Sequence, residues 1–303
     1  MTEPPRAVEA TTAVLRRPHP VGTPLYYAVH GEQRPDTFYS SEVGDTDDAV
    51  ILLRQGPPDE DVNEVLQLDR NGNPLWSTLA MNGRDELTDV RARGAMIAAA
   101  GTRYLGSEEE STGEELDVWG FSPAGQALFE YTGPAYTSGG PVDVCADGTV
   151  IAGGEGTLPG STTSGAFLVA LDRTGQATWT AALPGVTLTK VTCGGDGIIR
   201  VAGWGASGAF AAQVEADGRV DWTWNGTEAL STSGSMGIDG AGDVVVASTV
   251  KTSDGASRVV VYSLDAAGRL AWSWRSAGPS ATSRARSKPS ACEACSKHCT
   301  TGA

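Results

Sequence analysis

Four residues near the C-terminus could bind a metal ion. Cys292, Cys295, His298 and Cys299 lie within eight residues, and thiolate and imidazole groups are ligands that suit zinc or copper(I). The Ser and Thr residues among these cysteines also make the segment similar to the core of a ribosomally made peptide that is modified after synthesis. A third alternative is a shifted reading frame, which would give the segment no function. The sequence therefore predicts zinc or copper binding, chemical modification, or neither.

An acidic segment could attract a cation or a basic partner. Residues 107–117 read SEEESTGEELD and include Glu108, Glu109, Glu110, Glu114 and Glu115. Negative side chains gathered on one surface raise the local concentration of cations. The simpler interpretation, which we expect, is a solvated acidic loop with no ligand.

Two carboxylates could do acid–base chemistry. Asp89 and Asp143 each lie five residues before a turn glycine, Gly94 and Gly148 respectively. Paired carboxyl groups across a channel are the machinery of glycoside hydrolysis. The simpler interpretation is that each Asp flanks a turn. A Ser–His nucleophile has little support, because the chain has three histidines and no G-x-S-x-G sequence, so we assign no catalytic residue.

Two further cysteines occupy matching places in the sequence. Cys145 lies in VDVCADG and Cys193 lies in KVTCGGDG. Cysteines at matching places of neighbouring repeats need not lie within disulfide range. We therefore expect two small, buried side chains.

The elements that position these residues come from an internal repeat. Segments 66–77, 119–130, 169–180, 212–223 and 261–273 share a turn glycine followed by an aromatic residue. The first copy, LQLDRNGNPLWS, also has the oxygen alternation of a calcium loop, but the other copies lack it. The shared glycine suits a turn with positive φ. The turn glycines are Gly72, Gly125, Gly175, Gly218 and Gly268. The aromatic residues are Trp76, Phe129, Trp179, Trp222 and Trp272, and we expect them to pack one repeat on the next.

A second shared element precedes each of these hairpins. It is a short strand rich in small residues, at 49–56, 95–102, 149–156, 198–205 and 243–250. One unit therefore has four antiparallel strands in roughly 45–50 residues, the size of a β-propeller blade. We expect an all-β propeller over 21–277, with blades at about 39–80, 81–133, 134–184, 185–227 and 228–277. Residues 20–38 could supply a closing strand or a partial sixth blade. Residues 1–20 and 278–303 are predicted to be disordered.

The repeat resembles those of bacterial β-propeller proteins of the SBBP and PQQ-like kinds, in which an LD-x-x-G turn and a Trp close each blade. The resemblance covers about residues 39–277 and implies a fold. It implies no activity, because propellers serve many roles and no residue here marks a quinone-dependent dehydrogenase.

Charge and hydropathy limit the partners and the compartment. The formal net charge of −15 argues against nucleic-acid binding, which needs a basic surface. No segment has the 18 or so apolar residues of a membrane helix. The N-terminus lacks the apolar core of a signal peptide, so we expect a cytoplasmic protein if Met1 is the true start. A signal upstream of Met1 would instead place it outside the cytoplasm or in the cell envelope.

Three functions remain open on the sequence. The first is a non-catalytic propeller that presents its loops to a protein or carbohydrate partner. The second is a carrier of the Cys-rich tail, with the propeller as recognition domain. The third is a hydrolase that works from the central channel. We expect the first, because the sequence supports no catalytic residue.

Overall fold

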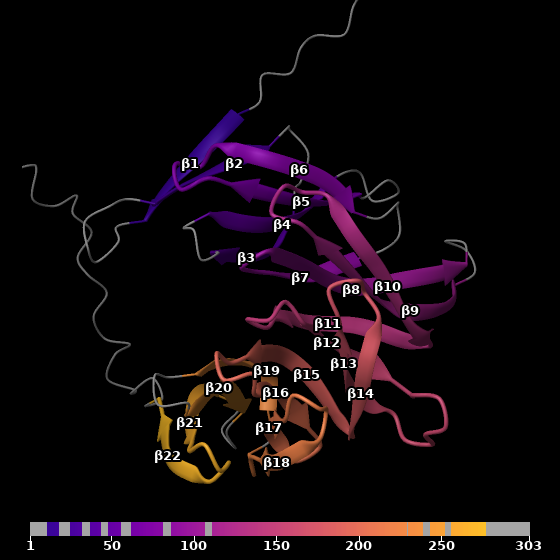
Figure 1. Ribbon diagram of the computed structural model, residues 1–303. Coiled ribbons are helices and arrows are strands. Elements are labelled where there is room, and N and C mark those ends of the chain that lie inside the picture. The colour runs from indigo at the N-terminus through magenta and orange to yellow at the C-terminus, as the bar shows by residue number, and fades with distance from the viewer. Residues whose placement is uncertain are drawn as a thin grey trace, which may run out of the picture.

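The computed structural model describes residues 11–17, 25–31, 37–43, 48–55, 62–80, 86–106, 111–228, 230–238, 243–251 and 256–276. Within these ranges the chain is all-β and contains no helix. The strands form one two-stranded hairpin and five four-stranded antiparallel sheets, which follow one another along an arc (Figure 1). Among these residues no helix is long and apolar enough to cross a bilayer.

The sheets follow chain order, and we call the four-stranded ones blades 1 to 5. The hairpin consists of β1 (Thr11–Arg17) and β2 (Leu25–Gly31). Blade 1 contains β3 (Thr37–Val43), β4 (Ala49–Gln55), β5 (Val62–Leu68) and β6 (Pro74–Ala80). Blade 2 contains β7 (Glu86–Arg93), β8 (Met96–Gly106), β9 (Ser111–Phe121) and β10 (Ala127–Ala135). Blade 3 contains β11 (Thr137–Val144), β12 (Val150–Gly156), β13 (Gly165–Leu171) and β14 (Ala177–Pro184).

The last two blades have the same plan. Blade 4 contains β15 (Val186–Cys193), β16 (Ile199–Gly205), β17 (Gly208–Val214) and β18 (Val220–Asn225). Blade 5 contains β19 (Leu230–Ile238), β20 (Val244–Lys251), β21 (Ser257–Leu264) and β22 (Leu270–Arg275). The residues of each blade correspond closely to one of the sequence repeats, and its four strands follow the predicted order.

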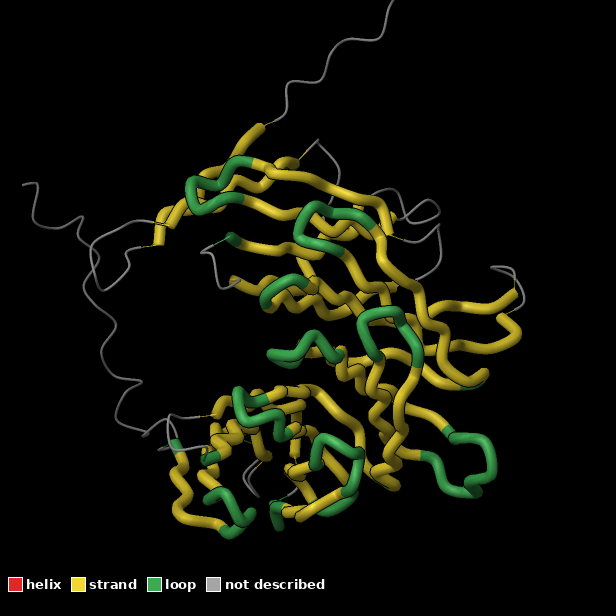
Figure 2. Tube along the Cα trace, in the orientation of Figure 1, coloured by secondary structure: helices red, strands yellow, loops and turns green. Residues whose placement is uncertain are grey.

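The first strand of each blade lies innermost. β11 packs against β7 on one side and β15 on the other, and β3 and β19 continue the series at its two ends. The strand rich in small residues is therefore second from the axis, and the strand with the repeat aromatic is outermost (Figures 1 and 2). Because the strands alternate in direction, the turns between strands one and two and between strands three and four share one face. We call it the turn face, and the opposite side the loop face.

The core lies between successive blades. Blades 2 and 3 enclose Ala98, Ala100, Phe129, Val142 and Phe167, all of them buried. Clusters of the same kind lie between blades 1 and 2, 3 and 4, and 4 and 5. The small residues permit the close approach of the inner strands: a Cβ on Gly139 of β11 would lie 1.7 Å from the carbonyl oxygen of Gly101 on β8.

The N-terminal region differs from the sequence prediction. We expected residues 1–20 to be disordered, but β1 occupies Thr11–Arg17 and pairs in register with β2. Residues 11–17 belong to none of the sequence repeats, so the comparison of repeats did not indicate this strand. The segment PLYYAVH, considered as a closing strand for the last blade, pairs through β2 with β1. The whole of the predicted C-terminal tail, residues 278–303, lies outside the described residues.

Candidate functional site

The repeated turns are built by backbone hydrogen bonds and glycine. Gly72, Gly125, Gly175, Gly218 and Gly268 all have positive φ, between 74° and 86°. In the first copy, the Asp69 carboxylate accepts hydrogen bonds from the backbone amides of Asn71 and Asn73, both at 2.8 Å. The side chain of Asn73 also donates to it, and these bonds hold the pKa of Asp69 below its usual range. The side chains of Asp69 and Asn73, which resemble part of a calcium loop in the sequence, therefore stabilise a turn.

Each repeat aromatic in blades 1 to 4 packs on the turn glycine of the following blade. The ring of Trp179 lies so close to Gly218 that a Cβ there would be 2.8 Å from the ring. Its indole N–H also donates to the carbonyl of Ala216, at 2.8 Å. We call this pair of contacts the blade latch. The aromatic–glycine pairs are Trp76 with Gly125, Phe129 with Gly175, Trp179 with Gly218, and Trp222 with Gly268. Trp76 and Trp222 make the corresponding indole bonds to the carbonyls of Pro123 and Ala266.

The two inner carboxylates do not occupy equivalent places. Asp143 pairs with Ile151, whereas the residue that pairs with Ala98 at the same level of blade 2 is Arg91. Asp89 lies farther along β7, opposite Ala100. The expected alignment was wrong because the Gly94 turn of blade 2 is shorter than the Gly148 turn of blade 3. Counting residues back from the glycine therefore shifts the register.

Both carboxylates join one blade to the next. Asp89 accepts a hydrogen bond from the Val142 amide on β11, at 3.1 Å, and also pairs with Arg91 at 3.0 Å. Asp143 accepts from the amides of Cys193, at 2.6 Å, and Val144, at 2.8 Å. Burial raises the pKa of Asp143 above its usual value, although these hydrogen bonds oppose the effect. The two side chains thus satisfy backbone amides and do not face each other as a catalytic pair.

Cys193 is the point where three blades meet. Its sulfur forms a disulfide with Cys145, with the Cα atoms 5.1 Å apart. Its amide is bound by Asp143, and its carbonyl accepts from the Arg93 guanidinium of blade 2 at 2.7 Å. Both cysteines are buried, as expected, but the disulfide between them was not expected. Both cysteines lie at the inner strand ends, where neighbouring blades are closest and disulfide geometry is met.

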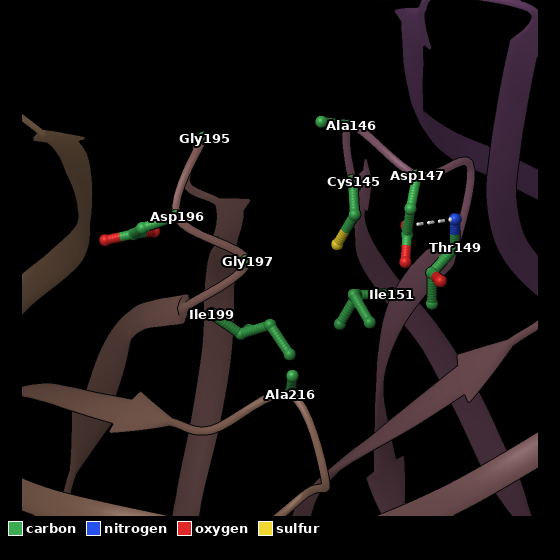
Figure 3. A pocket seen from close by; sticks show the side chains of 10 residues that line it. All are labelled: Cys145, Ala146, Asp147, Thr149, Ile151, Gly195, Asp196, Gly197, Ile199 and Ala216. Atoms are coloured by element: carbon green, nitrogen blue, oxygen red, sulfur yellow. Dashed lines mark hydrogen bonds between the residues drawn. The ribbon is translucent and has the colours of Figure 1, made fainter.

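A recess on the turn face lies beside this disulfide. It has a volume of about 240 Å³ and is lined by the inner turns of blades 3 and 4 (Figure 3). Asp147 folds back on its own turn, where a hydrogen bond from the Thr149 amide lowers its pKa. Asp196 points away from Cys145 and Ile151. The two carboxylates therefore do not converge on a common point.

A second recess, of about 280 Å³, opens on the loop face of the same blades. Trp204 at the end of β16 and Glu155 at the end of β12 line it, together with Ser164 and Thr187. The Thr187 hydroxyl donates to the Glu155 carboxylate at 3.2 Å. In the described part of the chain, the indole N–H of Trp204 makes no hydrogen bond. One signal in the sequence could have found this site: a large aromatic residue ends the otherwise small-residue run IIRVAGWG.

The acidic segment is partly a strand. Glu114 and Glu115 lie on β9, opposite Tyr104 and Arg103 of β8, and not in a loop as expected. The hairpin of β8 and β9 is long, and its pairing continues past the predicted boundary. Glu108, Glu109 and Glu110 lie outside the described residues, as do Cys292, Cys295, His298 and Cys299. Within the described ranges, no three His, Cys, Asp or Glu side chains are grouped closely enough to hold a metal ion.

Comparisons with known proteins bear on the fold alone. The sequence matches no protein-family model and no curated protein. Among solved structures, the Dos1 propeller is similar with a TM-score of 0.53 and 9% identity, over 86% of this chain and 64% of that one. The cobalt-substituted apocarotenoid oxygenase of Synechocystis has a TM-score of 0.53 and 10% identity, over 90% of this chain and 70% of that one. This chain thus spans less than two thirds of the Dos1 propeller chain. At such identities the likeness shows that the chain has a β-propeller type of fold.

Proposed function

We propose that this protein is a non-catalytic β-propeller that binds a partner, a carbohydrate or a protein, on its loop face. The observation that carries the proposal is the recess at Trp204. It lies where the variable loops leave the small-residue strands, and loops held by a rigid scaffold are where propellers and other repeat folds carry their binding residues.

The chemistry of the recess favours a carbohydrate over a protein. An indole offers an apolar face for the C–H groups of a sugar ring and a polar N–H beside it. The Glu155 carboxylate accepts hydrogen bonds from hydroxyl groups, and the hydroxyls of Ser164 and Thr187 can both donate and accept. The recess holds one aromatic residue, whereas protein interfaces concentrate several apolar anchors.

The inner carboxylates support a binding role over a hydrolytic one. A general acid or base must reach the substrate proton it transfers. Asp89 and Asp143 instead accept hydrogen bonds from backbone amides of the next blade. Substituting either Asp would therefore first disturb the contact between its own blade and the next one.

A panel of soluble oligosaccharides, screened on a glycan array and followed by calorimetric titration, tests the proposal. We expect Trp204→Ala to weaken binding about tenfold or more, and Trp204→Phe to retain most of it, because the ring supplies the platform. Leu75→Ala, which removes an exposed side chain of blade 1, is the matched control and should bind like the wild type. Binding that is unchanged in Trp204→Ala would contradict the site. Cleavage of the bound saccharide would contradict the non-catalytic role.

The disulfide also favours one of the two compartments considered from the sequence. Disulfides persist in oxidising compartments and are rare in the cytoplasm. We therefore propose that the protein works outside the cytoplasm or in the cell envelope. Trapping of free thiols in intact native cells, followed by mass spectrometry, should find Cys145 and Cys193 unmodified by the trapping reagent. Full labelling of both thiols would contradict this location.

A further inference from the structure

One connection between blades holds a tyrosine in a backbone conformation that favours glycine. Tyr136 joins β10 to β11 and has φ of 64°. In the part of the chain that the structure describes, it is the one residue other than glycine with positive φ. A bulky side chain disfavours this region, and residues held there against that cost concentrate at functional sites. The strain therefore points to a role for the tyrosine side chain.

The next connection shows that the fold itself needs no side chain at this place. Gly185 joins β14 to β15 as Tyr136 joins β10 to β11, and its φ of 71° is nearly the same. Nothing lies within 4 Å of a Cβ added to Gly185. Glycine makes this connection without strain, so the tyrosine is not required to form the turn. Gly185 also lines the recess at Trp204.

The ring of Tyr136 is exposed but supported on one side. The residue is 72% exposed. Its ring lies over Gly113 of β9, where an added Cβ would be 3.3 Å from the ring. The connection lies on the loop face, because β10 runs away from the turn that joins it to β9. An aromatic ring that is held by a strand and open to solvent is a platform for the apolar side of a ligand.

Tyr136 lies beside the recess on the loop face. A Cβ added to Gly156 would be 2.5 Å from the Tyr136 carbonyl oxygen, and Gly156 directly follows Glu155, which lines the recess. The Glu155 carboxylate accepts the hydrogen bond of Thr187 at 3.2 Å. Thr187 in turn is the cross-strand partner of Trp204. Two polar side chains therefore lie between the two aromatic residues, and a single sugar ring does not reach both.

We propose that Tyr136 is a second binding platform and that the site takes an extended oligosaccharide, which runs along the loop face from blade 4 to the start of blade 3. The inference rests on the proposed carbohydrate site at Trp204 and adds the length of the chain that it binds. One sugar ring lies at Trp204, and a later one lies on Tyr136. Between them, Glu155 and Thr187 form hydrogen bonds with the hydroxyl groups of the chain.

Calorimetric titration with saccharides of increasing length tests this inference. The probes are linear homo-oligomers of glucose, of mannose and of N-acetylglucosamine, from the monosaccharide to the hexasaccharide. We expect Tyr136→Gly to weaken the binding of long oligomers about three- to tenfold and to leave monosaccharide and disaccharide binding unchanged, because only a longer chain reaches the ring. Tyr136→Phe keeps the ring and should bind every length like the wild type. Trp204→Ala should weaken the binding of every length.

The glycine variant also separates binding from folding. Glycine adopts positive φ without strain, so the midpoint of urea unfolding should not fall in Tyr136→Gly. An equal loss of affinity at all lengths, or a lower midpoint, would show that the ring supports the fold and would overturn the inference. Binding of long oligomers that depends on Trp204 but not on Tyr136 would overturn it and leave the proposed function standing. If no oligomer binds the wild type, the proposed carbohydrate site fails and this inference fails with it.

Discussion

Replacing Gly218 by Ala tests the blade latch against a control in the same blade. Gly218 has φ of 86°, and an added Cβ would meet the ring of Trp179 at 2.8 Å. Gly197 has φ of 78°, and nothing lies within 4 Å of an added Cβ. Both turns have the same backbone hydrogen-bond pattern. The two substitutions therefore share the cost of positive φ and differ in the clash with the indole.

The expected magnitudes follow from these contacts. Positive φ in a residue with a Cβ costs roughly 1–2 kcal/mol, and this applies to both variants. Displacing Trp179 also breaks its bond to Ala216, which contributes about 1 kcal/mol. It also loses aromatic packing that contributes about 1 kcal/mol. We expect the free energy of unfolding to fall by about 1–2 kcal/mol in Gly197→Ala and about 2 kcal/mol more in Gly218→Ala.

Urea unfolding, followed by far-ultraviolet circular dichroism, measures this difference. The slope of free energy against urea should be the same in both variants, so that the midpoints can be compared directly. Equal losses of stability in the two variants would show that the contact between the indole of Trp179 and Gly218 contributes nothing to stability.

Three further predictions concern the inner strands and the latch. Replacing Cys145 and Cys193 together by Ser removes a link across 48 residues and should lower the free energy of unfolding by about 4 kcal/mol. Reductant should produce this loss in the wild type and leave the variant unchanged; equal urea midpoints for the two proteins would argue against the link. Trp179→Phe keeps a ring but loses the bond to Ala216, so it should cost about 1 kcal/mol in the same assay, and no change would refute that bond. Asp143 has a raised pKa in the folded state, so the folded protein holds more protons than the unfolded chain between the ordinary value of 3.8 and the raised one. Relative to Asp143→Asn, wild-type stability should therefore fall as pH rises through that window, and a pH-independent difference would contradict burial as the cause.

The repeat made most of the architecture predictable from the sequence. Turn glycines and aromatic residues recur at a fixed offset because each blade must meet its neighbour in the same way. Gly218 and Trp179 show this, because the turn glycine of one blade packs against the aromatic ring of the preceding blade. The order of strands within a blade followed from the same comparison. The strand nearest the axis did not follow, because small side chains suit both the first and the second strand.

The predictions that failed concern contacts between residues that lie far apart in the sequence. Asp89 and Asp143 were aligned from a glycine, but turns of different length changed the register of the strands behind them. The disulfide of Cys145 and Cys193 requires two inner strand ends to converge, and sequence spacing carries no such distance. The loop-face recess joins residues from two blades, so Trp204 had no partner in the sequence to draw attention to it.

Hydrogen exchange of the protein, with and without a binding oligosaccharide, tests whether the loop face of blades 3 and 4 is the binding site. We expect protection at the ends of β12 and β16 and at the start of β15, around Glu155, Trp204 and Thr187. We also expect Trp204→Ala to abolish this protection while the exchange of blade 1 stays unchanged. Protection confined to the turn face, or the same protection in Trp204→Ala, would contradict a binding site on the loop face of blades 3 and 4.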